Sequence, residues 1–218
     1  MANRLVKETG GNYIQGIGKL VIDGDKVLIN IDGKTYSDVE KSTLPEGAVS
    51  GEEYSFRLSG DGSELYSIRP VEASVVVKFD RFAASKNELP MPRIQKGGPK
   101  EYNGKKWYAQ DKLVFTAILK IVSKRYRGME IPYIMDYTFK QWEDSEDTVI
   151  PYGSKRKDQV VEFLKLFGWD EEQDSIPFSD NVLPFLEKLL KARGTKVLAT
   201  IKNGYIDSIS SYDDDLMG

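Results

Sequence analysis

Short apolar runs separated by turn-forming residues dominate the first third of this chain. Asp23-Gly24 and Asp32-Gly33 each stand between two such runs. An Asp-Gly pair in that position is a strong short-range signal of a β-hairpin. Five strands are therefore predicted, at residues 18–22, 26–31, 35–36, 53–58 and 65–69. Short strands at this density predict a small closed barrel or rolled sheet over residues 1–70.

The remainder of the chain carries longer strand signals and two helices. Strands are predicted at 71–82, 112–122, 129–139, 195–201 and 205–209, and amphipathic helices at 158–167 and 182–193. Residues 83–111 show no periodicity and contain three prolines, which is typical of a functional or disordered loop. Pro132 indicates an edge strand or a bulge. The predicted fold is mainly β (α+β), with a domain at 1–70, a second at 71–210 and a tail at 211–218.

The chain contains no histidine and no cysteine. This excludes Ser-His-Asp triads, Cys-His dyads, and zinc sites built from His or Cys. The acidic clusters lack EF-hand spacing, so we expect no metal site. No catalytic motif is visible in the sequence, so we expect no enzymatic activity. No run of 18 apolar residues and no secretory leader is visible, so we expect a cytoplasmic protein without a membrane partner.

Charge is distributed unevenly along the chain. The net charge is −3, yet residues 78–127 hold 13 Lys and Arg against 4 Asp and Glu. A basic segment within an acidic protein predicts a local contact with a polyanion. A chance cluster of solvated charges would produce the same count.

Cations and aromatic residues gather at the two ends of the strand predicted at 112–122. Single-stranded nucleic acid is held by cations along its phosphates and by aromatic rings that stack on its bases. We therefore predict a nucleic-acid site made of Tyr102, Lys105, Lys106, Trp107, Tyr108, Lys124, Arg125, Tyr126 and Arg127. The alternative interpretation is that Trp107 and Tyr126 are half-buried ends of a hairpin and that the cations only keep the surface soluble.

The C-terminal tail combines acidic residues with an apolar tip, made of Asp213, Asp214, Asp215, Leu216 and Met217. Such a tail can dock on a partner protein or compete for the basic segment of its own chain. An ordinary solvated terminus is the alternative.

A strand, a basic turn at Tyr126-Arg127-Gly128, a partner strand, two helices and the segment Gly194–Gly204 follow one another. This succession, over residues 73–218, resembles small bacteriophage single-stranded-DNA-binding proteins of the OB-fold type. The tail is similar to their acidic, apolar-tipped tails, although it ends in Leu-Met-Gly without a terminal Phe. The resemblance implies an OB-like barrel with two inserted helices at 71–210, with residues 1–70 as an added β-domain.

The resemblance also implies single-stranded DNA as the partner, a role in phage replication or recombination, no cofactor and no catalysis. Replication or recombination proteins would be partners of the tail, and a homo-oligomer is compatible with the sequence. A phage virion protein, in which the proline-containing segment 83–111 orders on a neighbouring subunit, is the rival hypothesis.

Overall fold

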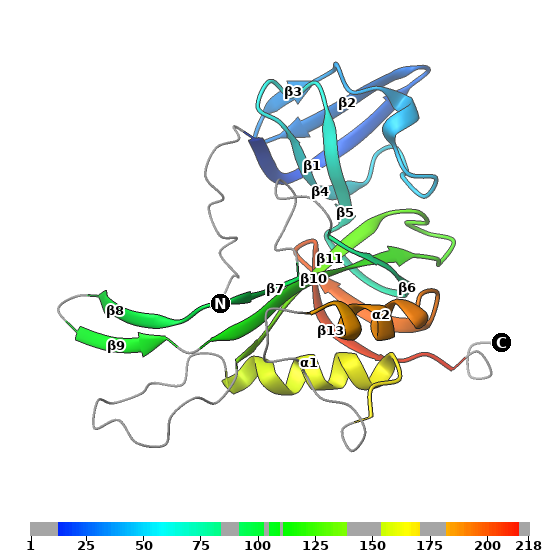
Figure 1. The fold of residues 1–218 in the computed structure, drawn as a ribbon. Helices are drawn as coiled ribbons and strands as arrows, with labels where there is room; N and C mark the ends of the chain where they lie inside the picture. The colour runs from blue at the N-terminus through cyan, green and yellow to red at the C-terminus, as the bar shows by residue number, and fades with distance from the viewer. Residues whose placement is uncertain are drawn as a thin grey trace. The chain divides into compact units, whose positions relative to one another are not determined.

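A computed structural model describes residues 13–83, 92–102, 105–109, 111–138, 154–170 and 182–213 (Figure 1). The predicted mainly β class is confirmed, because strands make up 54% of the structure and two helices are present in the described part. The strands form two antiparallel sheets, of five and six strands, and a separate two-stranded hairpin.

The first sheet contains the five strands predicted near the N-terminus. They are β1 (Tyr13–Asp23), β2 (Lys26–Ile31), β3 (Lys34–Tyr36), β4 (Glu53–Ser59) and β5 (Leu65–Pro70), with a 3-10 turn, η1, at Lys41–Thr43. Their order across the sheet is β3-β2-β1-β4-β5. Asp32 and Gly33 both have positive φ, 50° and 78°, as a tight type I′ hairpin requires.

Strand β1 takes part in two halves of this sheet. Residues Tyr13–Lys19 pair with β4, and residues Gly18–Asp23 pair with β2. At the overlap, a Cβ on Gly18 would collide with the carbonyl oxygen of Asn30 in β2. Glycine at this position therefore lets the two backbones approach closely, as a strand that curls from one partner to the next requires.

One face of the first sheet forms a hydrophobic core. Alternation with period 2 sends every second residue of a strand to the same face. The side chains on this face are fully buried and come from β1, β2 and β4: Leu20, Val27, Ile29, Tyr54, Phe56 and Leu58. Arg57, Ser55 and Ser59 of β4 alternate with these residues and lie on the opposite face.

Asp61 organises the turn between β4 and β5. Its carboxylate accepts hydrogen bonds from the Ser59 hydroxyl at 2.5 Å, and from the Ser63 backbone N–H and hydroxyl at 3.0 and 2.9 Å. These bonds favour the charged form and lower the pKa of Asp61 to about 2, with the Ser59 bond contributing most.

The stability supplied by Asp61 should depend on pH. Because the pKa is lower in the folded protein than in the unfolded chain, the contribution is complete above the ordinary value of 3.8 and is lost as the pH falls through about 2. We expect the free energies of unfolding of the wild type and Asp61→Asn to differ by a constant amount above about pH 5, to approach each other below about pH 4 and to converge at about pH 2. Urea denaturation across this range measures the difference, and a gap that stays constant down to low pH would contradict the shifted pKa.

The second sheet is built from the long strands of the chain. It contains β6 (Glu72–Phe82), β7 (Arg93–Gln95), β10 (Lys112–Ile121), β11 (Glu130–Thr138), β12 (Lys196–Lys202) and β13 (Tyr205–Ser211). The order is β11-β10-β6-β12-β13, with β7 also paired to β10. Strand β11 ends this order, so Pro132 occupies an edge strand as predicted.

Both sheets share one strand order. If β7 is left aside and the strands of each sheet are numbered in their order along the chain, both sheets have the order 3-2-1-4-5. In the second sheet, strands β7, β8 and β9 lie in the connection between the first and second strands. The helices α1 (Ser154–Leu166) and α2 (Leu183–Lys191) lie in the connection between the third and fourth.

The helices pack aromatic side chains against the second sheet. The ring centroids of Phe163 in α1 and of Phe167, which follows α1, lie 4.6 Å apart. The Phe167 ring in turn lies 5.6 Å from that of Phe79 in β6. Phe185 of α2 lies 5.7 Å from Phe115 of β10. Such offset aromatic contacts add stability beyond the area that they bury.

Neither helix of the described residues has the length and apolar character needed to cross a membrane.

The chain forms two compact units that are interleaved in sequence. Described residues up to 77 cluster with 120–131 and 198–208, whereas 78–119, 132–197 and 209–213 form the other unit where they are described. Strands of the second sheet contribute residues to both units. The predicted division of the chain at residue 70 stays a prediction.

Candidate nucleic-acid interface

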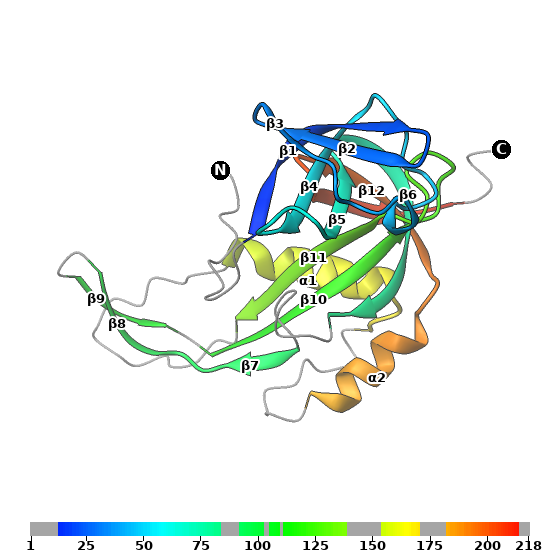
Figure 2. The same cartoon turned by 90° about the horizontal axis from the view of Figure 1, so that it is seen from above.

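The basic segment before β10 folds as a β-hairpin. Strands β8 (Gly98–Tyr102) and β9 (Lys105–Ala109) pair with each other, and Figures 1 and 2 show them side by side. Five predicted site residues lie on this hairpin: Tyr102, Lys105, Lys106, Trp107 and Tyr108. The segment 83–111 was predicted as an aperiodic loop, and this part of the prediction is wrong, because it contains β7, β8 and β9.

The register of the hairpin divides these residues between its two faces. Lys100 is opposite Trp107 and Tyr102 is opposite Lys105, whereas Glu101 is opposite Lys106. Directly paired residues share a face of an antiparallel ribbon, and faces alternate along each strand. Positions 100, 102, 105 and 107 therefore belong to one face, where two cations and two aromatic residues alternate.

The base of the hairpin is held by Asp111. Its Oδ1 accepts a hydrogen bond from the backbone N–H of Gly97 at 2.7 Å, and its Oδ2 lies 3.4 Å from Nζ of Lys96. Strand β7 pairs with the start of β10, with Ile94 opposite Leu113. These contacts join the two ends of the hairpin across its base.

The second predicted cluster occupies the turn between β10 and β11, and Tyr126 in this turn is buried. Tyr126 is only 8% exposed, and its ring meets that of Tyr54 edge-on at 6.1 Å. Burial raises its pKa. The backbone N–H of Gly47 donates to the carbonyl oxygen of Arg127 at 2.9 Å and closes the turn over residues 45–48. The prediction that Tyr126 is an open stacking platform therefore does not fit this structure.

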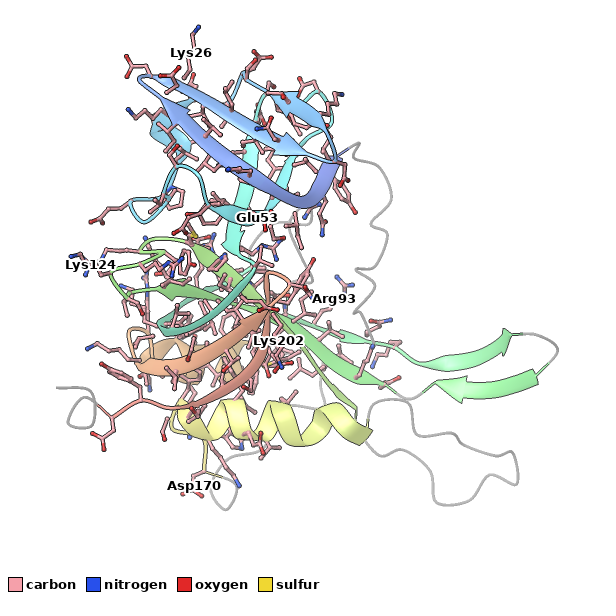
Figure 3. All side chains as sticks on the ribbon, turned by 180° about the vertical axis from the view of Figure 1, so that it is seen from behind. Lys26, Glu53, Arg93, Lys124, Asp170 and Lys202 are labelled. Atoms are coloured by element: carbon pink, nitrogen blue, oxygen red, sulfur yellow. The ribbon has the colours of Figure 1, made fainter. Side chains whose placement is uncertain are left out.

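The cations beside Tyr126 differ in their environments. Arg125 Nη2 lies 2.9 Å from Glu52 Oε1, so a neighbouring carboxylate offsets its charge. Lys124 and Arg127 are exposed, and Figure 3 shows Lys124 at the periphery of the structure. The hairpin and this turn belong to different compact units. The single groove lined by both clusters stays a prediction.

A third group of cations and aromatic rings, where no site was predicted, combines residues of the first sheet with Tyr205 of β13 in the second sheet. The Arg57 guanidinium lies 4.3 Å from the centroid of the Tyr13 ring, and the Arg69 guanidinium lies 5.0 Å from that of Tyr205. Gln15 Nε2 donates a hydrogen bond to the Tyr205 hydroxyl at 3.0 Å. No local sequence signal indicates this group, because its members come from β1, β4, β5 and β13.

The acidic tail is represented by one residue in the structure. Asp213 is exposed, and Asp214, Asp215, Leu216 and Met217 lie outside the described residues. Within the described part of the chain, no group of three or more acidic residues is placed to hold a metal ion.

No protein-family model matches this chain, and no curated protein matches it in sequence. The resemblance to bacteriophage DNA-binding proteins therefore stays a prediction. Strand order, charge and local geometry remain as the basis for a functional proposal.

Proposed function

We propose that this protein binds single-stranded DNA without sequence specificity, through the face of the β8–β9 hairpin that carries positions 100, 102, 105 and 107. The role would be in phage replication or recombination, as the resemblance implies. The alternation of cationic and aromatic positions on this face is the observation that carries the proposal. Cations neutralise phosphates and aromatic rings stack on bases regardless of their identity.

The strand order supports an OB-type architecture for both sheets. In an OB fold the first strand is shared by two halves of the sheet, and the edge strands, third and fifth, approach each other to close the barrel. Strand β1 is shared in this way between β2 and β4. A Cβ on Gly62, in the turn before β5, would collide with the ring of Tyr36 at the end of β3. The two edges of the first sheet are therefore close at this point, and we propose an OB-type barrel for each sheet.

The position of the hairpin supports the same function. In OB folds, the loops between strands 1 and 2 and between strands 4 and 5 bind oligonucleotides. The β8–β9 hairpin lies in the connection between the first and second strands of the second sheet. A basic-aromatic insertion at this place gives the barrel an extended nucleic-acid-binding arm.

The proposal predicts salt-dependent binding of oligo-dT. We expect the logarithm of the association constant to fall linearly with the logarithm of the salt concentration, with a slope of about −0.7 for each phosphate neutralised. Fluorescence anisotropy of a labelled oligo-dT at four or more salt concentrations measures the slope. Oligo-dC serves as the control for sequence, and its affinity should be similar.

Two outcomes would contradict the proposal. The first is no measurable binding at low salt, and the second is binding whose affinity does not respond to salt. Ordered self-assembly of a protein without DNA affinity would instead favour the virion-protein hypothesis.

A further inference from the structure

We infer that Arg57 and Arg69 form a second anion-binding site, on the face of β4 and β5 opposite the core, which takes a phosphodiester group of the bound strand. The inference rests on the proposed function and extends it from the hairpin to the first sheet. It assigns a ligand to two arginines that no sequence motif indicates.

Strand pairing brings the two arginines together. Gln15 of β1 is opposite Arg57 of β4, and Arg57 is opposite Ser67 of β5. Arg69 follows two residues after Ser67 and is opposite Ser55. The arginines thus occupy diagonal positions on one face of adjacent strands, which long side chains can bridge.

Neither arginine has a carboxylate partner among the described residues. Arg57 stacks on Tyr13, and Arg69 on Tyr205. Arg69 donates from Nη1 to the Gly204 carbonyl oxygen at 3.2 Å and from Nη2 to the Ser67 hydroxyl at 3.3 Å. All of these partners are neutral. The Nε atoms of both arginines are buried and have no hydrogen-bond partner in the structure.

This arrangement concentrates positive charge, and none of the described residues supplies a counter-ion. Arg69 is only 4% exposed. Burial lowers its pKa, and repulsion from Arg57 lowers it further, although Tyr205 acts in the opposite direction. Buried charges in proteins are normally paired, because an unpaired one loses its hydration without compensation. An anion that contacts Arg57 would offset the repulsion and provide the missing partner.

A ligand can reach this site from the side of β1. Arg57 is half-buried, Gln15 is exposed, and Ile17 further along β1 is 44% exposed. Arg57 would contact the anion directly. Arg69, which is buried, would contribute its charge without contacting the anion and would hold the Tyr205 ring in place. The Tyr13 and Tyr205 rings and Ile17 give the charged centre apolar surroundings. A phosphodiester with its sugar and base matches these surroundings better than a free phosphate, which has no apolar part.

The test compares Arg57→Gln with the wild type in oligo-dT binding at several salt concentrations. We expect about 3- to 10-fold weaker binding and a salt slope less negative by about 0.7, the loss of one neutralised phosphate. Arg57→Lys keeps the charge and should retain most of the slope. Lys19→Ala is the matched control, because it removes one positive charge from the same strand face as Gln15 but opposite Glu53. This variant should bind within about twofold of the wild type.

A second arm separates this inference from the proposed function. Inorganic pyrophosphate is added to the wild type and to Arg57→Gln, and the midpoint of thermal unfolding is measured at constant ionic strength. A ligand that binds only the folded state raises the midpoint. We expect pyrophosphate to raise it in the wild type and to have a smaller effect in Arg57→Gln.

Each outcome decides one of the two hypotheses. If oligo-dT binds the wild type and Arg57→Gln with equal affinity and slope, the arginine site is wrong and the hairpin proposal stands. If oligo-dT does not bind at all, the proposed function is wrong. In that case, a midpoint shift that depends on Arg57 supports an anion site for free phosphates, and equal shifts in both proteins overturn the site. Circular dichroism spectra confirm that the variants are folded.

Discussion

Replacing Trp107 with alanine is expected to weaken oligo-dT binding by about 5- to 150-fold. Stacking of a base on an aromatic side chain contributes roughly 1–3 kcal/mol by alanine substitution, and about 1.4 kcal/mol corresponds to a factor of ten. Trp107 lies in β9 opposite Lys100, on the face of the hairpin where cations and aromatic residues alternate. Trp107→Phe keeps an aromatic ring and should recover most of the affinity.

The two neighbouring lysines of β9 provide a matched pair of variants. Lys105 shares the face of Trp107, whereas Lys106 lies opposite Glu101 in the strand register, on the other face. We therefore expect Lys105→Ala to weaken binding more than Lys106→Ala and to make the salt slope less negative by about 0.7. Equal effects of the two substitutions would contradict the assignment of one binding face. Unchanged affinity in Trp107→Ala would contradict the stacking role itself.

Replacing Gly18 with alanine is expected to lower the free energy of unfolding by about 3 kcal/mol, since forcing extra atoms into a packed site costs typically 1–3 kcal/mol and sometimes more. The added Cβ would collide with the carbonyl oxygen of Asn30. Gly18 pairs with β2 and β4 at once, opposite Ile31 and Tyr54. The backbone of β2 cannot retreat there without breaking its ladder with β1.

Gly16→Ala is the control for this substitution. Gly16 lies on the same strand, two residues earlier, and its added Cβ would meet the Cγ2 methyl of the Ile31 side chain rather than a backbone atom. A side chain adjusts more easily than a paired backbone, so we expect a cost of about 1 kcal/mol. Chemical denaturation of both variants measures the difference. Equal costs would contradict the close approach of β1 and β2 at Gly18.

Local patterns predicted most of the strands and both helices. Asp32-Gly33 forms the predicted hairpin turn because the residues themselves favour positive φ. Phe163 and Phe167 recur at helical spacing and are buried as that spacing predicts. These features depend on residues close together in the chain, which is why a single sequence reveals them.

The hairpin of β8 and β9 was missed for a physical reason. Its strands are five residues each, and they contain glycine, proline and charged residues that disfavour strands. Cross-strand pairing stabilises them instead, and pairing is not visible as periodicity within one strand. The sequence identified the residues as a basic-aromatic cluster, and the register separated them into two faces.

Tyr126 shows how a distant residue changes the interpretation of a motif. The sequence Lys-Arg-Tyr-Arg indicates an exposed basic-aromatic turn. Gly47, almost eighty positions earlier, lacks the side chain that would keep the turn away, and the backbone of Tyr126 fits against it. The ring is therefore buried beside Tyr54, and only the flanking cations remain exposed.

The sequence by itself determined the mainly β class, the basic character of residues 78–127, and the absence of His and Cys chemistry. These properties follow from composition and from contacts between near neighbours. Only the tertiary structure decided the strand order shared by the two sheets, the burial of Tyr126, and the meeting of Arg57 with Arg69. The strand order and the burial of Tyr126 depend on contacts between segments far apart in the chain, and the proximity of Arg57 to Arg69 depends on the register between β4 and β5. None of these leaves a signal within any one segment.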